Sequence, residues 1–450
     1  MQKKLGTEKI LPLLIKFSVP ATIGILITMI YNITDRYFIG QYVGGKGLGA
    51  LAITFPLTIL ILGISMLFTM GGASSAGIKL GEKDKDGAEK VLGTTVFWII
   101  VIGGLLSIVS LLFLPEILTF LGASKGNIGE ALDYNYYLLP FAMFQISFIS
   151  LNGFLRVEGN PMLSMKVNLF GAGLNILLDY IFIAHMNMGM IGAAIGTAAA
   201  SVIPSFYMIA HLYKSKVIKL DLNKIKPNKK IMKRITDVGM GAFYNQLLSG
   251  ITIFIMNKNL NIYGGDLAIA AAGIVMTMRN FMNISFIGFN QGRQPILSYN
   301  YGAKNFDRVK ETYILSTKIV LLIVIVLTLL IVGGAKYVAA FFVSDVQLIE
   351  LTSSALVLNL ILMFSTSLYF STFNYYQAVG KGKKNKRLLV IRVFFLTIPL
   401  LFILPKLMGL NGVWLAVPIA DTIAMIFALY SMKGEFRELD SELDLAKGGV

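Results

Sequence analysis

The feature that most constrains this chain is an internal sequence repeat, in which short strings recur in the second half about 220 residues after their first occurrence. Hydrophobic segments of matching length lie between these anchors, so whole helical units are repeated rather than isolated motifs. Membrane proteins with two repeated halves commonly move a substrate through a central site between them. The anchors are 80–83 with 301–304, Gly159 with Gly380, and 189–192 with 409–412.

The repeated units are predicted to be membrane-spanning helices. The chain is 56% hydrophobic and only 14% charged, which is more apolar surface than a soluble domain of this size requires. Runs of about 20 apolar residues, the length that crosses a bilayer, recur along the whole sequence. The twelve predicted spans are 13–34, 50–72, 92–114, 134–156, 164–184, 190–212, 236–257, 268–292, 312–333, 350–377, 388–405 and 411–432.

The distribution of basic residues predicts the topology. Both ends of the chain and the even-numbered loops fall on one side, and that side carries most of the 40 Lys and Arg residues. By the positive-inside rule, both termini are expected in the cytoplasm of a cell with the protein in its inner or plasma membrane. The net charge of +16 is therefore interpreted as a topology signal that contacts anionic lipid, and nucleic-acid binding is not expected. The opposite side holds Arg36, Lys46, Lys125, Lys258, Lys336 and Lys406.

Four regions are predicted from these spans. Residues 1–213 form an N-lobe with the first six helices, and 214–234 form a basic cytoplasmic linker. Residues 235–432 form a C-lobe with the last six helices. Residues 433–450 form a polar cytoplasmic tail, expected to be mobile or a short surface helix.

Several kinds of chemistry have no support in the sequence. The chain has no cysteine, hence no disulfide or thiol nucleophile, and it has no P-loop for ATP. His185 and His211 stand alone, without metal-ligand spacing or a nucleophile partner. The glycine-rich stretches 44–49 and 380–382 follow helices and are predicted to be turns. No catalytic residue and no cofactor are expected, and active transport would draw on an ion gradient.

Acidic residues inside the spans are the main functional candidates, because a buried carboxylate is costly in a bilayer. Asp179 shares a helix face with Asn175 at the i, i+4 spacing, and Asp35 ends the first span at a comparable depth. With Thr197 as a further oxygen ligand, these groups could hold either a proton or Na⁺. The alternative for the Asn175–Asp179 pair is a structural contact between helices.

The remaining polar groups in the spans suggest a wet cavity. Asp421 and Arg279 each lie within a span without an evident partner, and Arg279 is the only Arg assigned to the membrane interior. Thirty Phe, 19 Tyr and 21 Met could line an adaptable, polarisable site for organic cations. The other polar candidates for this cavity are Tyr31, Gln246, Asn283 and Gln291.

Five strings together resemble the multidrug and toxic compound extrusion (MATE) family over residues 10–432, with most similarity to its MepA-like bacterial branch. The strings are Asp35-Arg36-Tyr37-Phe38-Ile39-Gly40, Arg156-Val157-Glu158-Gly159-Asn160, 175–183 (NILLDYIFI), Gly192-Ala193-Ala194, and Gln294-Pro295 with Tyr299-Asn300-Tyr301-Gly302-Ala303.

The resemblance implies a V-shaped pair of six-helix bundles that exports organic cations in exchange for H⁺ or Na⁺. It also implies an ion site in the N-lobe at Asp35, Asp179, Asn152, Asn175 and Thr197. One departure concerns the seventh helix, where some branches carry an acid that contributes to a C-lobe cation site. The matching stretch 242–246 offers only amides, so coupling is expected to depend on the N-lobe.

Antiport of small organic cations by a monomer is the leading hypothesis. The first alternative is a flippase for lipid-linked precursors, which would need a cavity rich in cationic groups; Arg279 alone does not supply one. The second alternative is a membrane-embedded enzyme, which would need convergent His, Asp or Glu residues or a nucleophile dyad, and the isolated histidines do not provide it.

Overall fold

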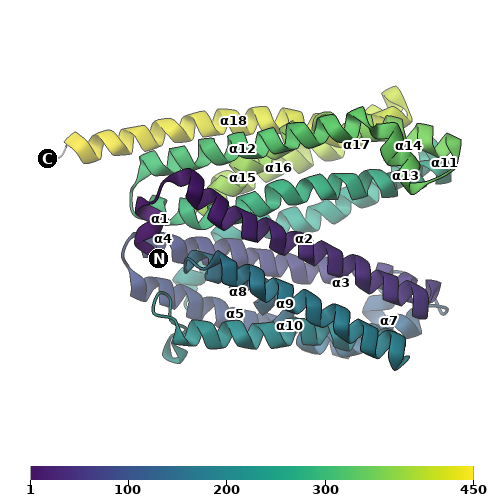
Figure 1. The fold of residues 1–450 in the computed structure, drawn as a ribbon, viewed down its shortest axis with the longest axis horizontal. Coiled ribbons are helices and arrows are strands. Elements are labelled where there is room, and N and C mark those ends of the chain that lie inside the picture. The colour runs from purple at the N-terminus through teal and green to yellow at the C-terminus, as the bar shows by residue number, and fades with distance from the viewer. Residues whose placement is uncertain (1, 449–450) are drawn as a thin grey trace.

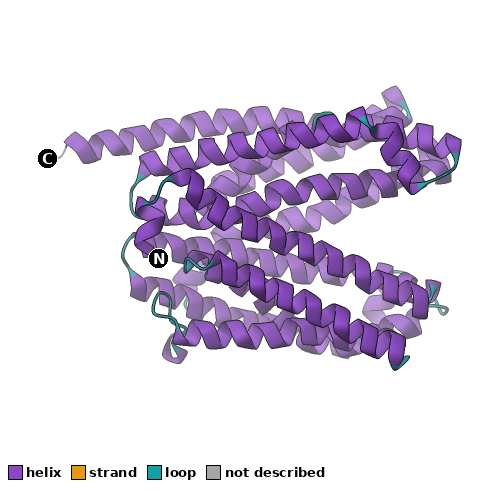
Figure 2. Ribbon diagram, in the orientation of Figure 1, coloured by secondary structure: helices purple, strands orange, loops and turns teal. Residues whose placement is uncertain are grey.

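The computed structural model describes residues 2–448, and all secondary structure in that range is helical (Figure 2). In chain order the elements are α1 (Gln2–Thr7), α2 (Ile10–Tyr42), α3 (Gly45–Phe68), η1 (Thr69–Ala73), α4 (Ser74–Gly81), α5 (Lys85–Leu112), α6 (Leu114–Phe120), α7 (Ile128–Leu138), η2 (Leu139–Phe141), α8 (Ala142–Val157), α9 (Pro161–Asp179), η3 (Tyr180–His185), α10 (Gly189–Lys214), η4 (Leu222–Lys224), α11 (Lys229–Gly302), α12 (Phe306–Gly333), α13 (Ala335–Phe342), α14 (Val346–Leu360), α15 (Met363–Ala378), α16 (Gly382–Val390), η5 (Ile391–Thr397), α17 (Ile398–Met408) and α18 (Leu410–Gly448).

The helices account for twelve membrane spans. Ten helical segments of the described residues are long and apolar enough to cross a bilayer. One of them, α11, has 74 residues and consists of two helices that meet at Gly265, where the backbone is not helical. A further span is formed by α14 and α15, which are bent by 40° at a short break. With α11 counted as two spans, the predicted number is confirmed.

The turns of the two halves repeat one another at the level of the backbone. Eight of the ten described residues with positive φ form pairs separated by the same offset as the sequence anchors; Gly122 and Asn187 are the two without such a counterpart. These pairs show that the predicted anchors are real structural equivalents, because a positive φ marks the same kind of tight turn at each position. The pairs are Gly44 (81°) with Gly265 (61°), Lys83 (61°) with Lys304 (58°), Gly159 (97°) with Gly380 (76°), and Gly189 (57°) with Gly409 (57°).

The glycine-rich stretches are turns over a shorter length than predicted. At the first stretch, only Gly44 takes the turn, and α3 already begins at Gly45. Gly380 behaves in the same way, since α16 begins at Gly382. The short helices α6 and α13, which follow the third and ninth spans, were not predicted, because seven or eight residues give too short an apolar run.

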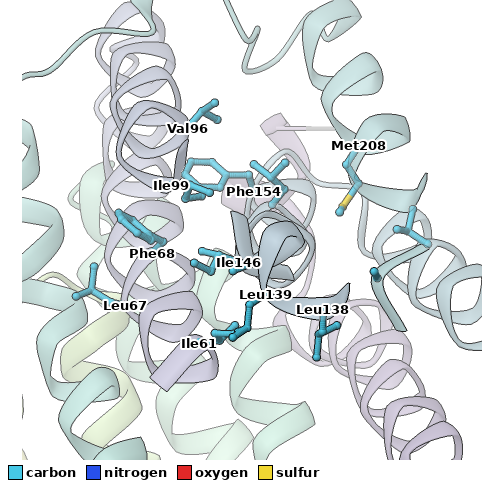
Figure 3. Close-up of a cluster of buried hydrophobic side chains, with 14 of the residues drawn as sticks. Ile61, Leu67, Phe68, Val96, Ile99, Leu138, Leu139, Ile146, Phe154 and Met208 are labelled. Atoms are coloured by element: carbon cyan, nitrogen blue, oxygen red, sulfur yellow. The ribbon is translucent and has the colours of Figure 1, made fainter. Parts of the chain in front are cut away.

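The helices form two bundles that converge at one end and diverge at the other (Figure 1). Both termini lie toward the converging end. The first bundle is held by buried apolar side chains of α3, α5, α8 and α10, including Phe68, Ile99, Phe154 and Met208 (Figure 3). Since lipid is as apolar as these side chains, their contribution is close packing rather than removal from water.

Helix α2 belongs to both bundles. Its first half packs into the core of the second bundle, where Leu13, Leu14 and Phe17 are buried against residues of α11 and α12. Its second half, which carries Asp35, contacts α9 of the first bundle. A change in the position of α2 therefore reaches both bundles.

The two bundles touch closely at the converging end. Gln294 Nε2 of α11 donates a hydrogen bond of 2.7 Å to Ser74 Oγ of α4, and both side chains are buried. A Cβ atom at Gly81 would lie 2.0 Å from the carbonyl oxygen of Tyr299, and one at the equivalent Gly302 would lie 2.0 Å from that of Ile78. Only glycine permits this approach.

The basic linker between the halves is fixed to the first bundle. Lys224 Nζ contacts a carboxylate oxygen of Glu89 at 2.5 Å and one of Asp86 at 2.9 Å, both on α5. These hydrogen bonds raise the pKa of Lys224 to about 12, and the bond to Glu89 contributes the most. The linker is therefore a docked connector over this part of its length.

The described part of the tail continues the last helix instead of forming a separate segment. Helix α18 extends to Gly448, and Glu435 within it is fully buried. The Glu435 carboxylate pairs with Lys381 Nζ at 2.7 Å and Lys384 Nζ at 2.8 Å, around the start of α16. These ion pairs hold the polar end of α18 against the second bundle.

Candidate functional site

The N-lobe candidates come together between α2, α9 and α10. Asn175 and Asp179 lie one turn apart on α9 and are buried, with Asp179 fully inaccessible. Asn175 Nδ2 donates to Thr197 Oγ1 of α10 at 3.5 Å. The amide, the carboxylate and the hydroxyl that were predicted to act together therefore occupy one place in the fold.

Asp35 completes this cluster from α2. Its carboxyl group faces that of Asp179, and the two interact directly. Within the described residues, Asp35 Oδ1, both oxygens of Asp179 and Asn175 Oδ1 are buried and accept no hydrogen bond of standard geometry. Two carboxylates at close range in a buried site cannot both remain charged without a cation, so the pair needs a proton or a metal cation.

The carboxylate of Asp179 sits directly against the backbone of α10. A Cβ atom at Gly196 would lie 2.6 Å from Asp179 Oδ1. The sequence suggested helix packing for this glycine, and the structure adds a second role, which is to leave room for the carboxylate. Immediately after Asp179 the chain forms η3, a π-helical turn, a local distortion that often occurs at functional sites.

Two tyrosines surround the acid pair. Tyr31, a predicted cavity residue, lies one turn before Asp35 on α2 and interacts with it. Tyr134 of α7 lies close to both Thr197 and Asp35 and is buried. Tyr134 was missed, although it begins the fourth predicted span, 134–156.

Asn152 occupies a different environment from the acid pair. Its Nδ2 donates to the Phe148 carbonyl at 2.7 Å, and its Oδ1 accepts from Ser164 Oγ at 2.8 Å. Ser164 also receives a hydrogen bond from Arg156. The structure therefore joins Asn152 to the α8–α9 contact, and within the described residues it makes no hydrogen bond to Asp35 or Asp179.

The second bundle contains a buried ion cluster that corrects the sequence analysis. Asp421 of α18 accepts from Arg392 Nε at 2.6 Å and from Arg279 Nη2 at 3.3 Å. Arg392 falls inside the predicted span 388–405 but was overlooked, so Arg279 was wrongly taken as the only Arg in the membrane interior. Arg392 lies early in that span, in the π-helical turn η5, which packs against α18.

The other polar candidates do not join the acid pair. Gln246, Asn283 and Gln291 are partly buried on α11, and Asn283 Oδ1 has no hydrogen-bond partner in the described part of the chain. Within residues 2–448, no group of three or more His, Asp or Glu side chains has the arrangement of a metal site. The acid pair, with amide and hydroxyl oxygens around it, is thus the main candidate for ion binding.

The family model for MatE matches the chain twice, over residues 20–181 and 242–403. The chain belongs to the MatE family. The double match also confirms the internal duplication, since one model describes both halves of this MATE protein.

Related proteins and structures agree with this assignment. The multidrug export protein MepA of Staphylococcus haemolyticus (strain JCSC1435) is 30% identical over 416 residues, covering 92% of this chain and 91% of the relative. MepA of Staphylococcus aureus (strain MSSA476) is 30% identical over 417 residues, with the same shares covered.

Solved MATE structures share the fold of this chain. A crystal structure of MATE in complex with MaL6 has a TM-score of 0.91 at 24% identity, covering 97% of this chain and 99% of that one. An outward-facing structure of a multidrug resistance MATE transporter of the MOP superfamily has a TM-score of 0.90 at 24% identity, covering 95% and 96%. The fold prediction is therefore confirmed, and the family of transporters points away from an enzyme.

Proposed function

We propose that this MATE protein is a secondary active efflux transporter that exchanges amphipathic organic cations for H⁺ or Na⁺. The observation that carries the proposal is the Asp35–Asp179 pair, in which Asp35 Oδ1 and both oxygens of Asp179 are buried and lack hydrogen-bond partners in the described chain. The resemblance to multidrug export proteins over 92% of the chain supports the direction of transport. Small molecules are the expected cargo, and no ATP or nucleic acid is required.

Exchange follows from competition for the same negative charge. A cation bound between Asp35 and Asp179 removes the attraction that an organic cation would feel in the first bundle. The organic cation therefore leaves when the ion enters, and the reverse happens on the other side. Such negative coupling between two ligands is the thermodynamic requirement for antiport.

Helix α2 provides the mechanical link in this scheme. Its second half carries Asp35, and its first half is packed in the second bundle. Ion binding at Asp35 changes the balance of forces on α2, and this change is transmitted to the contact between the bundles. We place the converging end, with both termini, on the cytoplasmic side, in agreement with the positive-inside pattern.

The test is ethidium efflux from de-energised cells under an imposed H⁺ or Na⁺ gradient. Asp35→Asn and Asp179→Asn are expected to abolish gradient-driven efflux at unchanged expression, because the amide cannot exchange a proton and binds cations weakly. Asp133→Asn, which removes an exposed acid from α7 of the same bundle, is the matched control and should transport normally.

The gradient that drives efflux identifies the coupling ion. Failure of both gradients in the wild-type protein would contradict organic-cation antiport. Normal driven efflux in both Asn variants would show that the acid pair is not the coupling site.

A further inference from the structure

The second bundle holds a buried cluster whose charges do not cancel. Arg279 and Arg392 both bind Asp421, and Thr366 Oγ1 donates to Asp421 Oδ2 at 2.7 Å. Arg279 Nη1 also donates to Asn359 Oδ1 at 3.0 Å. Two guanidinium groups and one carboxylate leave one positive charge, and no second acid contacts either arginine in the described chain.

The two arginine side chains of this cluster are not completely buried. Asp421 is fully buried, whereas the side chains of Arg279 and Arg392 retain 13% and 12% of their exposure. Arg392 uses only Nε in its contact with Asp421, and no hydrogen bond from its two terminal nitrogens is found within residues 2–448. The terminal edge of a guanidinium presents two parallel N–H groups, which match the two oxygens of a carboxylate.

A second donor lies beside Arg392 without a partner. The Tyr369 hydroxyl is buried and makes no hydrogen bond in the described chain, although its ring lies 5.2 Å from the Arg392 guanidinium. An unpaired buried hydroxyl is costly, and a bound oxyanion would satisfy it.

Aromatic rings line the same place. The Arg392 guanidinium lies 4.9 Å from the centre of the Phe370 ring, which stacks on Phe286 with centroids 5.7 Å apart. Such rings favour a flat aromatic ligand next to the charge. The single excess charge matches a monoanion, whereas a diphosphate would leave uncompensated negative charge in a buried site.

We propose that Arg392, Arg279 and Tyr369 form a subsite in the second bundle for the carboxylate of aromatic amphipathic substrates. The proposal rests on the proposed efflux function and assigns residues of this chain that would bind the anionic end of a substrate.

The experiment compares equilibrium binding of two dyes to the full-length protein in phosphatidylcholine nanodiscs, without an ion gradient. Rhodamine B carries a cationic ring system and a free carboxylate, and its ethyl ester keeps the cation but lacks the carboxylate. Wild type should bind the acid at least as tightly as the ester. In Arg392→Gln the preference for the acid over the ester should fall about tenfold, because a charged hydrogen-bond partner is lost.

Two further variants separate recognition from folding. Arg392→Gln leaves Asp421 paired with Arg279, and Tyr369→Phe removes only one hydroxyl, so Tyr369→Phe should lower the preference several-fold even if the first variant unfolds. Lys318→Gln, which removes an exposed charge from α12, is the control and should keep the wild-type preference.

Three results would overturn the proposal. The first is that folded Arg392→Gln binds rhodamine B and its ester more weakly by the same factor. The second is that Arg392→Gln and Tyr369→Phe both keep the wild-type preference for the acid over the ester, and the third is that farnesyl diphosphate binds more tightly than rhodamine B at the same cluster. Because no gradient is applied in the binding experiment, loss of the preference for the acid with intact binding of the ester tests only the subsite. Absence of gradient-driven ethidium efflux tests only the proposed antiport.

Discussion

Gly196 leaves space for the Asp179 carboxylate against α10, because the side chain of glycine is a single hydrogen atom. The position of the acid pair therefore depends on this glycine. Asp179 Oδ1 lies 2.6 Å from the place that a Cβ atom would take. The sequence shows Gly192 and Gly196 as a spacing that allows helices to approach. The structure shows that the space at Gly196 is used by the Asp179 carboxyl group.

Gly196→Ala is therefore expected to push the Asp179 carboxylate out of position and to weaken ion coupling about tenfold, since overpacking of a filled site costs roughly 1–3 kcal/mol. The measurement is gradient-driven ethidium efflux at matched expression. Gly173→Ala on α9, where an added Cβ meets no atom within 4 Å, should behave as wild type. Equal efflux in both variants would show that the contact at Gly196 does not matter.

The arginine cluster of the second bundle also depends on individual charged residues that pair with one another. Asp421 and Arg279 were both recognised as costly groups that needed partners, and they proved to be each other's partners. Arg392 was overlooked although the predicted span 388–405 contains it, because hydropathy averaged over a span does not single out one charged residue. Its contact with Asp421 joins η5 to α18, and the two residues are 29 positions apart in the chain.

Among the helices, α11 shows how one residue sets an element boundary. Gly265 separates two spans with φ 61° and ψ −156°, and an added Cβ there meets nothing within 4 Å. Any penalty for a side chain at this position is thus backbone strain, because L residues rarely adopt this conformation.

Gly265→Ala should lower the stability of the protein by about 1–2 kcal/mol, through that strain alone. The measurement is thermal unfolding in detergent followed by tryptophan fluorescence. Gly273→Ala is the matched control: this glycine lies in the helical continuation of α11 with open space around it, and alanine should be neutral or slightly stabilising there. A melting temperature for Gly265→Ala equal to that of the control would contradict the strain argument.

At the scale of the whole molecule, the contact between the bundles decides which end is closed. Gly81 and Gly302 occupy equivalent places in the two halves, and each lies against the backbone of the opposite bundle. In the proposed transport cycle this contact must open and close, so a bulky side chain there would hold the bundles apart.

Gly302→Leu is expected to hold the converging end open and to reduce efflux at least about tenfold, since the Cβ would lie 2.0 Å from the Ile78 carbonyl oxygen. Because the chain has no cysteine, Ser298→Cys supplies a single thiol at this buried contact. Its labelling by a water-soluble maleimide should be faster in Gly302→Leu than in wild type. Gly104→Leu on α5, where space is open, should change neither quantity; unchanged labelling in Gly302→Leu would contradict a closed contact here.

The sequence by itself determined the features that depend on local chemistry and on position along the chain. Apolar run length predicts each span, because every backbone polar group in lipid must be satisfied within its own helix. The repeated glycines predict equivalent turns, because only positive φ closes them tightly. The cost of burying charge singled out Asp35, Asp179, Arg279 and Asp421.

Only the tertiary structure decided which of these residues meet. Asp35 and Asp179 face each other because α2 crosses from the second bundle to α9, whereas Asn152 turns toward Ser164. Tyr134 and Arg392 join their clusters through contacts between helices far apart in the chain. Helix periodicity specifies a face but not the neighbour that covers it, and that neighbour is set by the packing of all the helices together.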